Sequence, residues 1–220
     1  MSDLTFRPAN PADIDTIVDI IVGEPNQIST NVILQLYGVE DAALAKQIYK
    51  ISAEIDEVWR KTTLAERNGV VVGVLQVPNT AVSSHTLGKI LKTAFVYLPQ
   101  YIKIGYRLFG LRFMSEGRKR TKLQQHVQVQ APPDAYKIGE LHVVPTQRGQ
   151  GIGSQMLNYA KQDARAHGYS QMALRTWTTN PAVRLYERHG FEIVQTSTNK
   201  EFENLTGASG NYLMVKNLQP

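Results

Sequence analysis

Cysteine is absent from this chain of 220 residues. The chain therefore has no disulfide, no thiolate metal site and no cysteine nucleophile. The five histidines are scattered without the spacing of metal ligands, so we expect no metal site. The longest uncharged run, residues 68–88, contains Pro78 and Asn79 and does not suit a bilayer span. The first ten residues lack the apolar core of a secretory signal, and we expect a cytoplasmic protein.

Positive charge is concentrated in one segment, residues 84–125. Nine basic residues and a single acidic one, Glu116, give this segment a net charge of +8. Since the whole chain carries +5, the remainder carries −3. Apolar residues at helical spacing predict one helix over 87–98 and a second over 101–114. We predict one domain over residues 1–220, with residues 84–125 inserted in it as a basic helical segment.

The sequence leaves three roles open for this insertion. Its helices could form a lid whose cations attract an anionic acceptor or the phosphates of a cofactor. Its aromatic and basic residues could instead lie on a membrane or a nucleic acid. The helices could also complete the core or form a homodimer interface. The chain has no recognised nucleic-acid-binding motif, so a nucleic-acid partner is not expected.

Short-range signals predict the other elements. Asn10 is a typical N-cap before Pro11 at the first position of a helix. Asn68-Gly69 is the strongest two-residue signal for a β-hairpin. The predicted strands are 4–7, 62–67, 70–77, 136–144, 171–176, 192–197 and 212–216. The predicted helical regions begin at Pro11, at about Thr30 with a break at Gly38, at Ile152 and at Pro181.

A loop with alternate glycines follows the strand 136–144. Gly149, Gly151 and Gly153 open a helix whose apolar face is formed by Ile152, Met156, Leu157, Ala160 and Ala164. Glycines leave the backbone accessible, and the first turn of a helix has unpaired N–H groups at the positive end of the dipole. Such a turn attracts phosphate, and Arg148 adds a positive charge beside it. The loop is therefore predicted to cradle a diphosphate.

Two familiar phosphate loops do not fit this stretch. A P-loop requires a lysine after its glycines, and none is present. A dinucleotide fingerprint requires G-x-G-x-x-G and an acidic residue about 20 positions later, and residues 170–173 hold no carboxylate. Arg148-Gly149-Gln150-Gly151-Ile152-Gly153 instead resembles the R/Q-x-x-G-x-G/A acyl-CoA motif of the GNAT superfamily of N-acetyltransferases. Residues 180–191, which end in Gly190-Phe191, are similar to the second motif of that family, with alanine at 182 rather than 183.

The resemblance implies a fold, a cofactor and a set of contacts. The fold is α/β (α+β), with a mixed, mostly antiparallel sheet of about six to seven strands flanked by helices. The acyl donor is acetyl-CoA, whose pantetheine pairs with exposed backbone groups near Val143 and Val144. The implied cofactor-binding residues are Leu141, His142, Val143, Val144, Arg148, Gly149, Gln150, Gly151, Ile152, Gly153, Ser154, Asn180 and Tyr186.

The resemblance also implies how the reaction proceeds. An amine attacks the thioester directly in a ternary complex, so the absence of cysteine is no obstacle. Tyr186 is the candidate acid for the leaving thiolate. Glu140 is the candidate base, either directly or through water, and His142 is a second candidate because residues two apart share a strand face. We expect an N-acetyltransferase that acts on a primary amine of a small molecule or peptide. The alternative is a non-catalytic acyl-CoA sensor.

Overall fold

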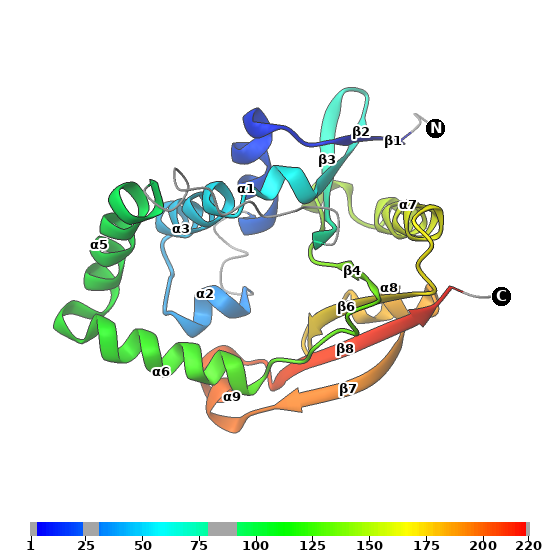
Figure 1. Ribbon diagram of the computed structural model, residues 1–220. Coiled ribbons are helices and arrows are strands. Elements are labelled where there is room, and N and C mark those ends of the chain that lie inside the picture. The colour runs from blue at the N-terminus through cyan, green and yellow to red at the C-terminus, as the bar shows by residue number, and fades with distance from the viewer. Residues whose placement is uncertain (1–3, 24–30, 79–91, 219–220) are drawn as a thin grey trace.

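The computed structural model describes residues 4–23, 31–78 and 92–218, and its strands form two four-stranded sheets (Figure 1). The first sheet has the order β1 (Leu4–Pro8), β2 (Thr62–Arg67), β3 (Val70–Gln76), β5 (Leu141–Val143). The second has the order β4 (Tyr136–Ile138), β6 (Gln171–Trp177), β8 (Gly210–Asn217), β7 (Glu192–Thr198).

The strand pairing confirms a mixed, mostly antiparallel α/β (α+β) fold, because only β4 and β6 pair in parallel among the described strands. The strands are divided between two sheets, whereas the sequence predicted one. The single strand predicted over 136–144 is wrong, because this segment divides after Ile138 and supplies one strand to each sheet.

Helices surround both sheets. They are α1 (Ile14–Val22), α2 (Val32–Leu36), α3 (Ala42–Ile55), α5 (Leu98–Phe109), α6 (Phe113–His126), α7 (Ile152–Ala166), α8 (Val183–Arg188) and α9 (Lys200–Thr206). None of the helices within the described ranges is long and apolar enough to cross a membrane.

Several elements follow the local signals closely. Asn10 caps a short 3-10 turn, Pro11–Asp13, that leads into α1, and its side chain accepts a hydrogen bond from the N–H of Ala12. Asn68 and Gly69 both have positive φ values, 54° and 74°, as a two-residue hairpin of the primed type requires. The predicted break at Gly38 is confirmed, because this residue has a φ of 65° between α2 and α3. These outcomes depend on residues that are neighbours in the chain.

The main core lies where α7 packs on β3 and β5 of the first sheet and on β6 of the second. All five residues of the apolar face predicted for α7 are buried, with at most 2% of their surface exposed. Met156 approaches Gly73 of β3 so closely that an added Cβ would lie 2.8 Å from its sulfur atom. Together these contacts hold the beginning of α7 against the end of β5.

The helices of the basic segment differ from their prediction. Residues 87–91 of the first predicted helix lie outside the described residues. A π-helical turn, Thr93–Tyr97, runs directly into α5. Pro99 lies in the first turn of α5, a position that tolerates a residue without a backbone N–H. Gly110 then ends α5 with a φ of 57°, and α6 begins at Phe113. The single helix predicted over 101–114 is therefore wrong.

The loop predicted between the last two strands contains a helix, α9. Asn199 caps it by accepting a hydrogen bond from the N–H of Phe202 at 2.9 Å. The Phe202 side chain is fully buried and stacks on Trp177. Sequence reasoning missed this helix, because the short polar stretch has no helical apolar repeat.

Asp13→Asn is expected to lower the free energy of unfolding by about 1–3 kcal/mol at neutral pH. Arg7 donates to both carboxylate oxygens of Asp13 at 2.8 Å, and the N–H of Asn10 donates to one of them. These bonds, that from Arg7 foremost, hold the pKa of Asp13 below its usual value. Because the folded pKa is the lower one, the stabilisation is present above the unfolded pKa of about 4 and is lost as the pH falls below it.

Urea denaturation at pH 7 and at low pH measures this difference. Asp15→Asn is the matched control, because Asp15 is largely exposed and, within the described residues, forms an ion pair with Lys50 alone. Equal losses for the two variants at pH 7 would contradict the role given to Asp13.

Candidate active site

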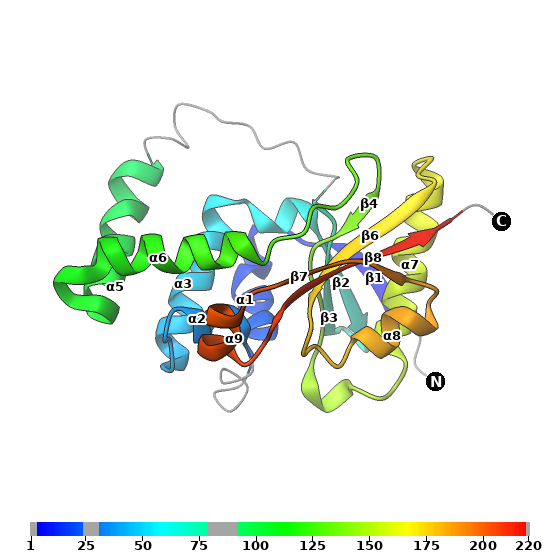
Figure 2. The same cartoon turned by 90° about the horizontal axis from the view of Figure 1, so that it is seen from below.

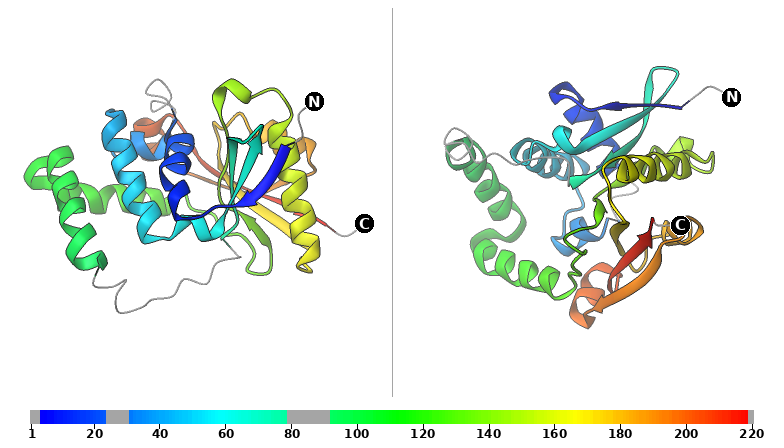
Figure 3. Two further views of the ribbon diagram at one scale, coloured as in Figure 1. Left: turned by 90° about the horizontal axis from the view of Figure 1, so that it is seen from above. Right: turned by 45° about the vertical axis from the view of Figure 1, so that its right-hand side comes forward.

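The two sheets separate at the segment that follows β4. β4 runs parallel to β6, from the pair Tyr136 and Met172 to the pair Ile138 and Leu174. β5 instead pairs antiparallel with β3, and its other edge has no strand partner among the described residues. Figure 3 shows the two sheets diverging on either side of this segment. The divergence leaves one edge of β5 free to pair with an extended ligand.

Gly139 makes the change of sheet possible. Its N–H donates to the carbonyl of Gln76 at 2.8 Å, and the N–H of Gln76 donates to the carbonyl of Glu140. A Cβ at Gly139 would lie 3.1 Å from the Pro78 ring, which is closer than an ordinary van der Waals contact. A larger residue would therefore press the strand away from β3.

The hydrogen bonds to β3 decide which backbone groups of β5 face the opening. The N–H of Val144 donates to the carbonyl of Val72 at 3.0 Å, and its carbonyl accepts from Gln147. Because backbone groups alternate along a strand, those of Leu141 and Val143 point away from β3. Of the two residues named from the sequence for backbone pairing, Val143 faces the opening, whereas the N–H and carbonyl of Val144 are already bonded.

The glycine loop forms an open cradle at the beginning of α7. Gly149 and Gly151 have φ values of 77° and 76°, and a Cβ added to either would meet no atom within 4 Å. The first hydrogen bond into the helix runs from the N–H of Gln155 to the carbonyl of Gly151. The N–H groups of Ile152, Gly153 and Ser154 therefore precede the first helical bond. They are available to an anion at the positive end of a 15-residue helix.

Two arginines flank this cradle. Arg148 is exposed, and its Nε donates to the carbonyl of Val143 at 3.1 Å. Arg67, at the end of β2, donates to the side-chain oxygens of Gln147 and Gln150. The Nε of Arg67 is buried and has no hydrogen-bond partner among the described residues. Sequence reasoning missed Arg67, because nothing local links a hairpin residue to a loop 80 positions later.

α8 carries the buried side chain of Tyr186. Leu185 lies against the glycine turn, since a Cβ at Gly153 would be 3.0 Å from it. The Tyr186 side chain is 6% exposed, and its ring packs edge-on against Phe191. Burial, and to a smaller extent the negative charge of Glu140, raises the pKa of Tyr186 to about 12. The hydroxyl consequently keeps its proton at neutral pH.

Glu140 and His142 point to the same side of the chain, as their alternation predicts. The Nε2 of His142 lies 2.9 Å from a carboxylate oxygen of Glu140. The Glu140 side chain is 49% exposed, so water reaches it. The negative charge of Glu140 also contributes, after burial, to a raised pKa of Tyr49 on α3. The charge of Glu140 therefore influences tyrosines on two different helices.

The Asn180 side chain forms hydrogen bonds with neighbouring residues of the chain itself. Its side-chain oxygen accepts from the N–H of Ala182 at 2.9 Å, and its nitrogen donates to Thr176. The α-helix begins at Val183, two residues later than predicted. Asn180 thus caps the turn before α8, and its predicted contact with a cofactor remains a prediction.

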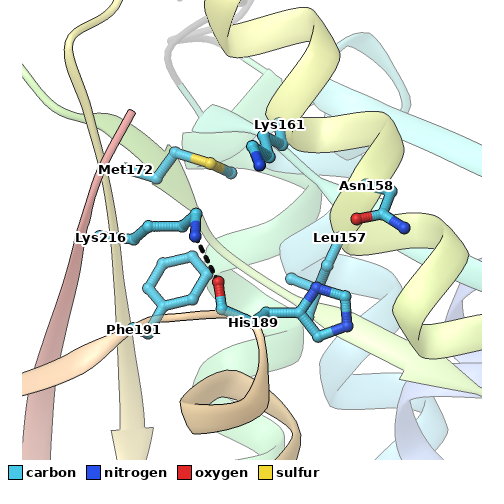
Figure 4. A pocket seen from close by; sticks show the side chains of 7 residues that line it. All are labelled: Leu157, Asn158, Lys161, Met172, His189, Phe191 and Lys216. Carbon is cyan, nitrogen blue, oxygen red and sulfur yellow. Dashed lines mark hydrogen bonds between the residues drawn. The ribbon is translucent and has the colours of Figure 1, made fainter. Parts of the chain in front are cut away.

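A separate small pocket lies on another part of α7 (Figure 4). Its volume is about 30 Å³, and it is lined by Leu157, Asn158, Lys161, Met172, His189, Phe191 and Lys216. The Lys216 ammonium donates to the carbonyl of His189 at the end of α8. This pocket contains none of the residues predicted for the site, and Lys216 serves here as a cap for α8.

Comparisons with known proteins agree with this geometry. A family model described as an acetyltransferase (GNAT) domain matches residues 120–193, which include the opening, the cradle and Tyr186. Among curated proteins, no sequence matches the chain significantly.

Solved structures share the fold. An acetyltransferase with 18% identity is similar over 98% of this chain and 100% of its own, with a TM-score of 0.55. The PaiA N-acetyltransferase of Thermoplasma acidophilum, solved in complex with coenzyme A, has 10% identity over 98% of this chain and 99% of its own, with a TM-score of 0.54. N-acetylglutamate synthase of Neisseria gonorrhoeae, complexed with coenzyme A and N-acetyl-glutamate, has 13% identity and a TM-score of 0.51 over 100% of this chain and 36% of its own.

At these identities the solved structures establish the fold, and the family model identifies the segment that carries the cradle. Residues 120–193 thus match the acetyltransferase (GNAT) domain, and the chain as a whole shares the fold of solved acetyltransferases, one of them in complex with coenzyme A.

Proposed function

We propose that this enzyme transfers an acetyl group from acetyl-CoA to a primary amine of a small molecule or peptide. The amine attacks the thioester directly in a ternary complex. The observation that carries the proposal is that the buried hydroxyl of Tyr186 lies within the influence of the negative charge of Glu140, which follows β4 at the opening between the sheets. A buried proton donor and an exposed carboxylate in the same region favour an enzyme over the non-catalytic sensor. Residues 1–220 would form one acyltransferase domain, with residues 84–125 inserted in it.

Different residues would bind different parts of acetyl-CoA. The outward backbone groups of Leu141 and Val143 would hold the pantetheine as an added strand. The cradle from Gly149 to Ser154, with Arg148, would hold the pyrophosphate. Arg67 fixes the loop through Gln147 and Gln150 and adds a second positive charge near it. When bound, acetyl-CoA supplies the activated acetyl group.

The proton transfers are assigned to two side chains. Glu140 accepts the proton that the ammonium group must lose, and its exposed carboxylate passes it to water or to His142. The N–H of Val143 donates to the developing oxyanion. As the C–N bond forms and the C–S bond breaks, Tyr186 gives its proton to the sulfur, and the second proton that the nitrogen loses restores the Tyr186 hydroxyl. Burial suits Tyr186 to this task, because its hydroxyl remains protonated until a strong base forms beside it.

Thioester consumption with a panel of amines, polyamines and peptides tests the proposal. We expect release of free thiol and formation of an amide with at least one acceptor. Binding of coenzyme A without turnover on the whole panel would favour the sensor instead.

Glu140→Gln is expected to lower kcat/KM by about 10- to 100-fold and to displace the acidic limb of its pH profile. The amide cannot accept the proton, although it keeps the shape of the side chain. Steady-state rates between pH 5 and pH 9, expressed as kcat/KM, provide the measurement, with Glu203→Gln on α9 as the control. If the profile of Glu140→Gln coincides with that of the parent, Glu140 is not the base.

A further inference from the structure

The helix α5 exposes an apolar stripe to solvent. Leu98, Ile102 and Tyr106 follow one another at intervals of four residues and so lie on one face of the helix. Phe95 precedes them, and Leu111 and Met114 continue at the corner with α6. We call these six exposed apolar residues the outer surface. Phe95 is 77% exposed, Leu111 is 91% exposed, and the other four are between 47% and 56% exposed. An exposed apolar patch of this kind marks an interaction site.

The fold does not need the outer surface, because α5 is attached by its other side. Tyr97 and Ile104 are buried in the core that α3 shares with α1. The hydroxyl of Tyr97 donates to Glu54 at 2.7 Å, and that of Tyr101 shares a hydrogen bond with Ser52. α5 therefore presents one apolar face to the protein and a second one to solvent.

Unpaired positive charge surrounds this surface. From Lys92 to Lys122 the described chain holds eight basic residues and one acidic residue, a net charge of +7. Some of these cations are paired, as Arg107 is with Asp41 and Lys119 with Glu201. The following are exposed and have no ion pair with a described residue: Lys103, Arg112, Arg118 and Lys122.

The outer surface is far from the catalytic opening. In Figures 1 and 2, α5 lies at the end of the molecule opposite α7, and α6 runs from that end toward α9. A large partner could cover this end and leave the cradle accessible.

We infer that the outer surface binds the headgroup region of an anionic lipid membrane. Apolar and aromatic side chains enter the boundary of the acyl chains, while neighbouring lysines and arginines attract acidic headgroups. The helices lie on the membrane, since none of those described could span it. A second copy of the chain fits poorly, because it would bring two segments of net charge +7 together. Nucleic acid would account for the cations but not for six exposed apolar side chains.

Co-sedimentation of the full chain with lipid vesicles tests this inference. We expect binding to vesicles of equal parts phosphatidylcholine and phosphatidylserine, and little binding to phosphatidylcholine alone. Ile102→Glu with Tyr106→Glu should reduce the partition coefficient by ~10-fold or more. Lys103→Gln with Arg112→Gln should reduce it by ~10-fold on the mixed vesicles, and so should high salt.

The matched control uses two apolar residues exposed elsewhere. Ile193 and Val194 on β7 are 41% and 57% exposed, close to the 47% and 56% of Ile102 and Tyr106. Ile193→Glu with Val194→Glu should bind the mixed vesicles as the parent does. Equal binding of the parent to both kinds of vesicle would overturn the inference, as would undiminished binding of the Ile102 and Tyr106 variant. A parent dimer that this variant converts to a monomer, seen by light scattering, would assign the surface to self-association instead.

Discussion

Gly151→Asp is expected to weaken coenzyme A binding by at least ~100-fold, as measured by titration calorimetry. The new carboxylate would project into the cradle at the beginning of α7, where the N–H groups and Arg148 attract phosphate. No atom lies within 4 Å of the added Cβ, so the effect comes from charge and not from a steric clash with the fold. The φ of 76° also lowers the stability of the variant, because residues other than glycine rarely adopt this backbone conformation.

Gly168→Asp separates these two effects. Gly168 follows the other end of α7, has a φ of 77° and also has no atom within 4 Å of an added Cβ. This variant has the same backbone cost but places its charge far from the cradle. We expect both variants to lose similar stability and Gly168→Asp alone to keep its affinity. Equal affinities for coenzyme A would exclude the cradle as the phosphate site.

Tyr186→Phe is expected to lower kcat by about 100-fold or more while the affinity for coenzyme A is retained. Phenylalanine preserves the ring that packs against Phe191 and removes only the hydroxyl to which we assign the proton for the leaving sulfur. Single-turnover rates measure the chemical step, and calorimetry measures binding. A loss of affinity without a loss of rate would assign Tyr186 to the binding of the cofactor.

Stability at high pH provides a second readout for Tyr186. Its folded pKa of about 12 lies above the unfolded value of about 10. The folded chain therefore holds this proton more tightly, and stability falls as the pH rises from about 10 to about 12. Tyr186→Phe should lack this part of the alkaline loss in urea denaturation.

Tyr136→Phe is the matched control for the rate. The Tyr136 hydroxyl is also largely buried, but it donates to Asp163 at 2.6 Å, away from Glu140. Its loss should cost about 1–2 kcal/mol of stability and leave kcat unchanged. An equal fall of kcat in both variants would show that a less stable fold, and not the loss of the Tyr186 proton, explains the lower rate.

Prediction from sequence succeeded where short-range rules act. Asn10 before Pro11, Asn68-Gly69 and Gly38 each determine the backbone within a few residues, and all three take the predicted conformations. The apolar face of α7 also followed from spacing alone, because 3.6 residues per turn place its five residues on one side. The resemblance to the GNAT family rested on two such local motifs, and the family model matches residues 120–193, which contain the first of them and residues 180–191.

Prediction failed where a residue depends on distant partners. The segment 136–144 reads as one strand, and only Gln76 and Pro78 across the sheet explain why it divides at Gly139. The role of Arg67 depends on a loop that it reaches only after folding. Gly110 ends α5 within a stretch that is apolar almost throughout, where periodicity shows no boundary.

The sequence by itself determined the cradle of Arg148 and its glycines, since this follows from backbone conformations set by adjacent residues, and its two motifs carried the resemblance that implied the acid and base candidates. Only the tertiary structure decided which amides of β5 face the opening, that the charge of Glu140 reaches Tyr186, and that α5 keeps an apolar face in water. Strand pairing and burial bring together residues that are far apart in the chain, and no local pattern specifies which of them will meet.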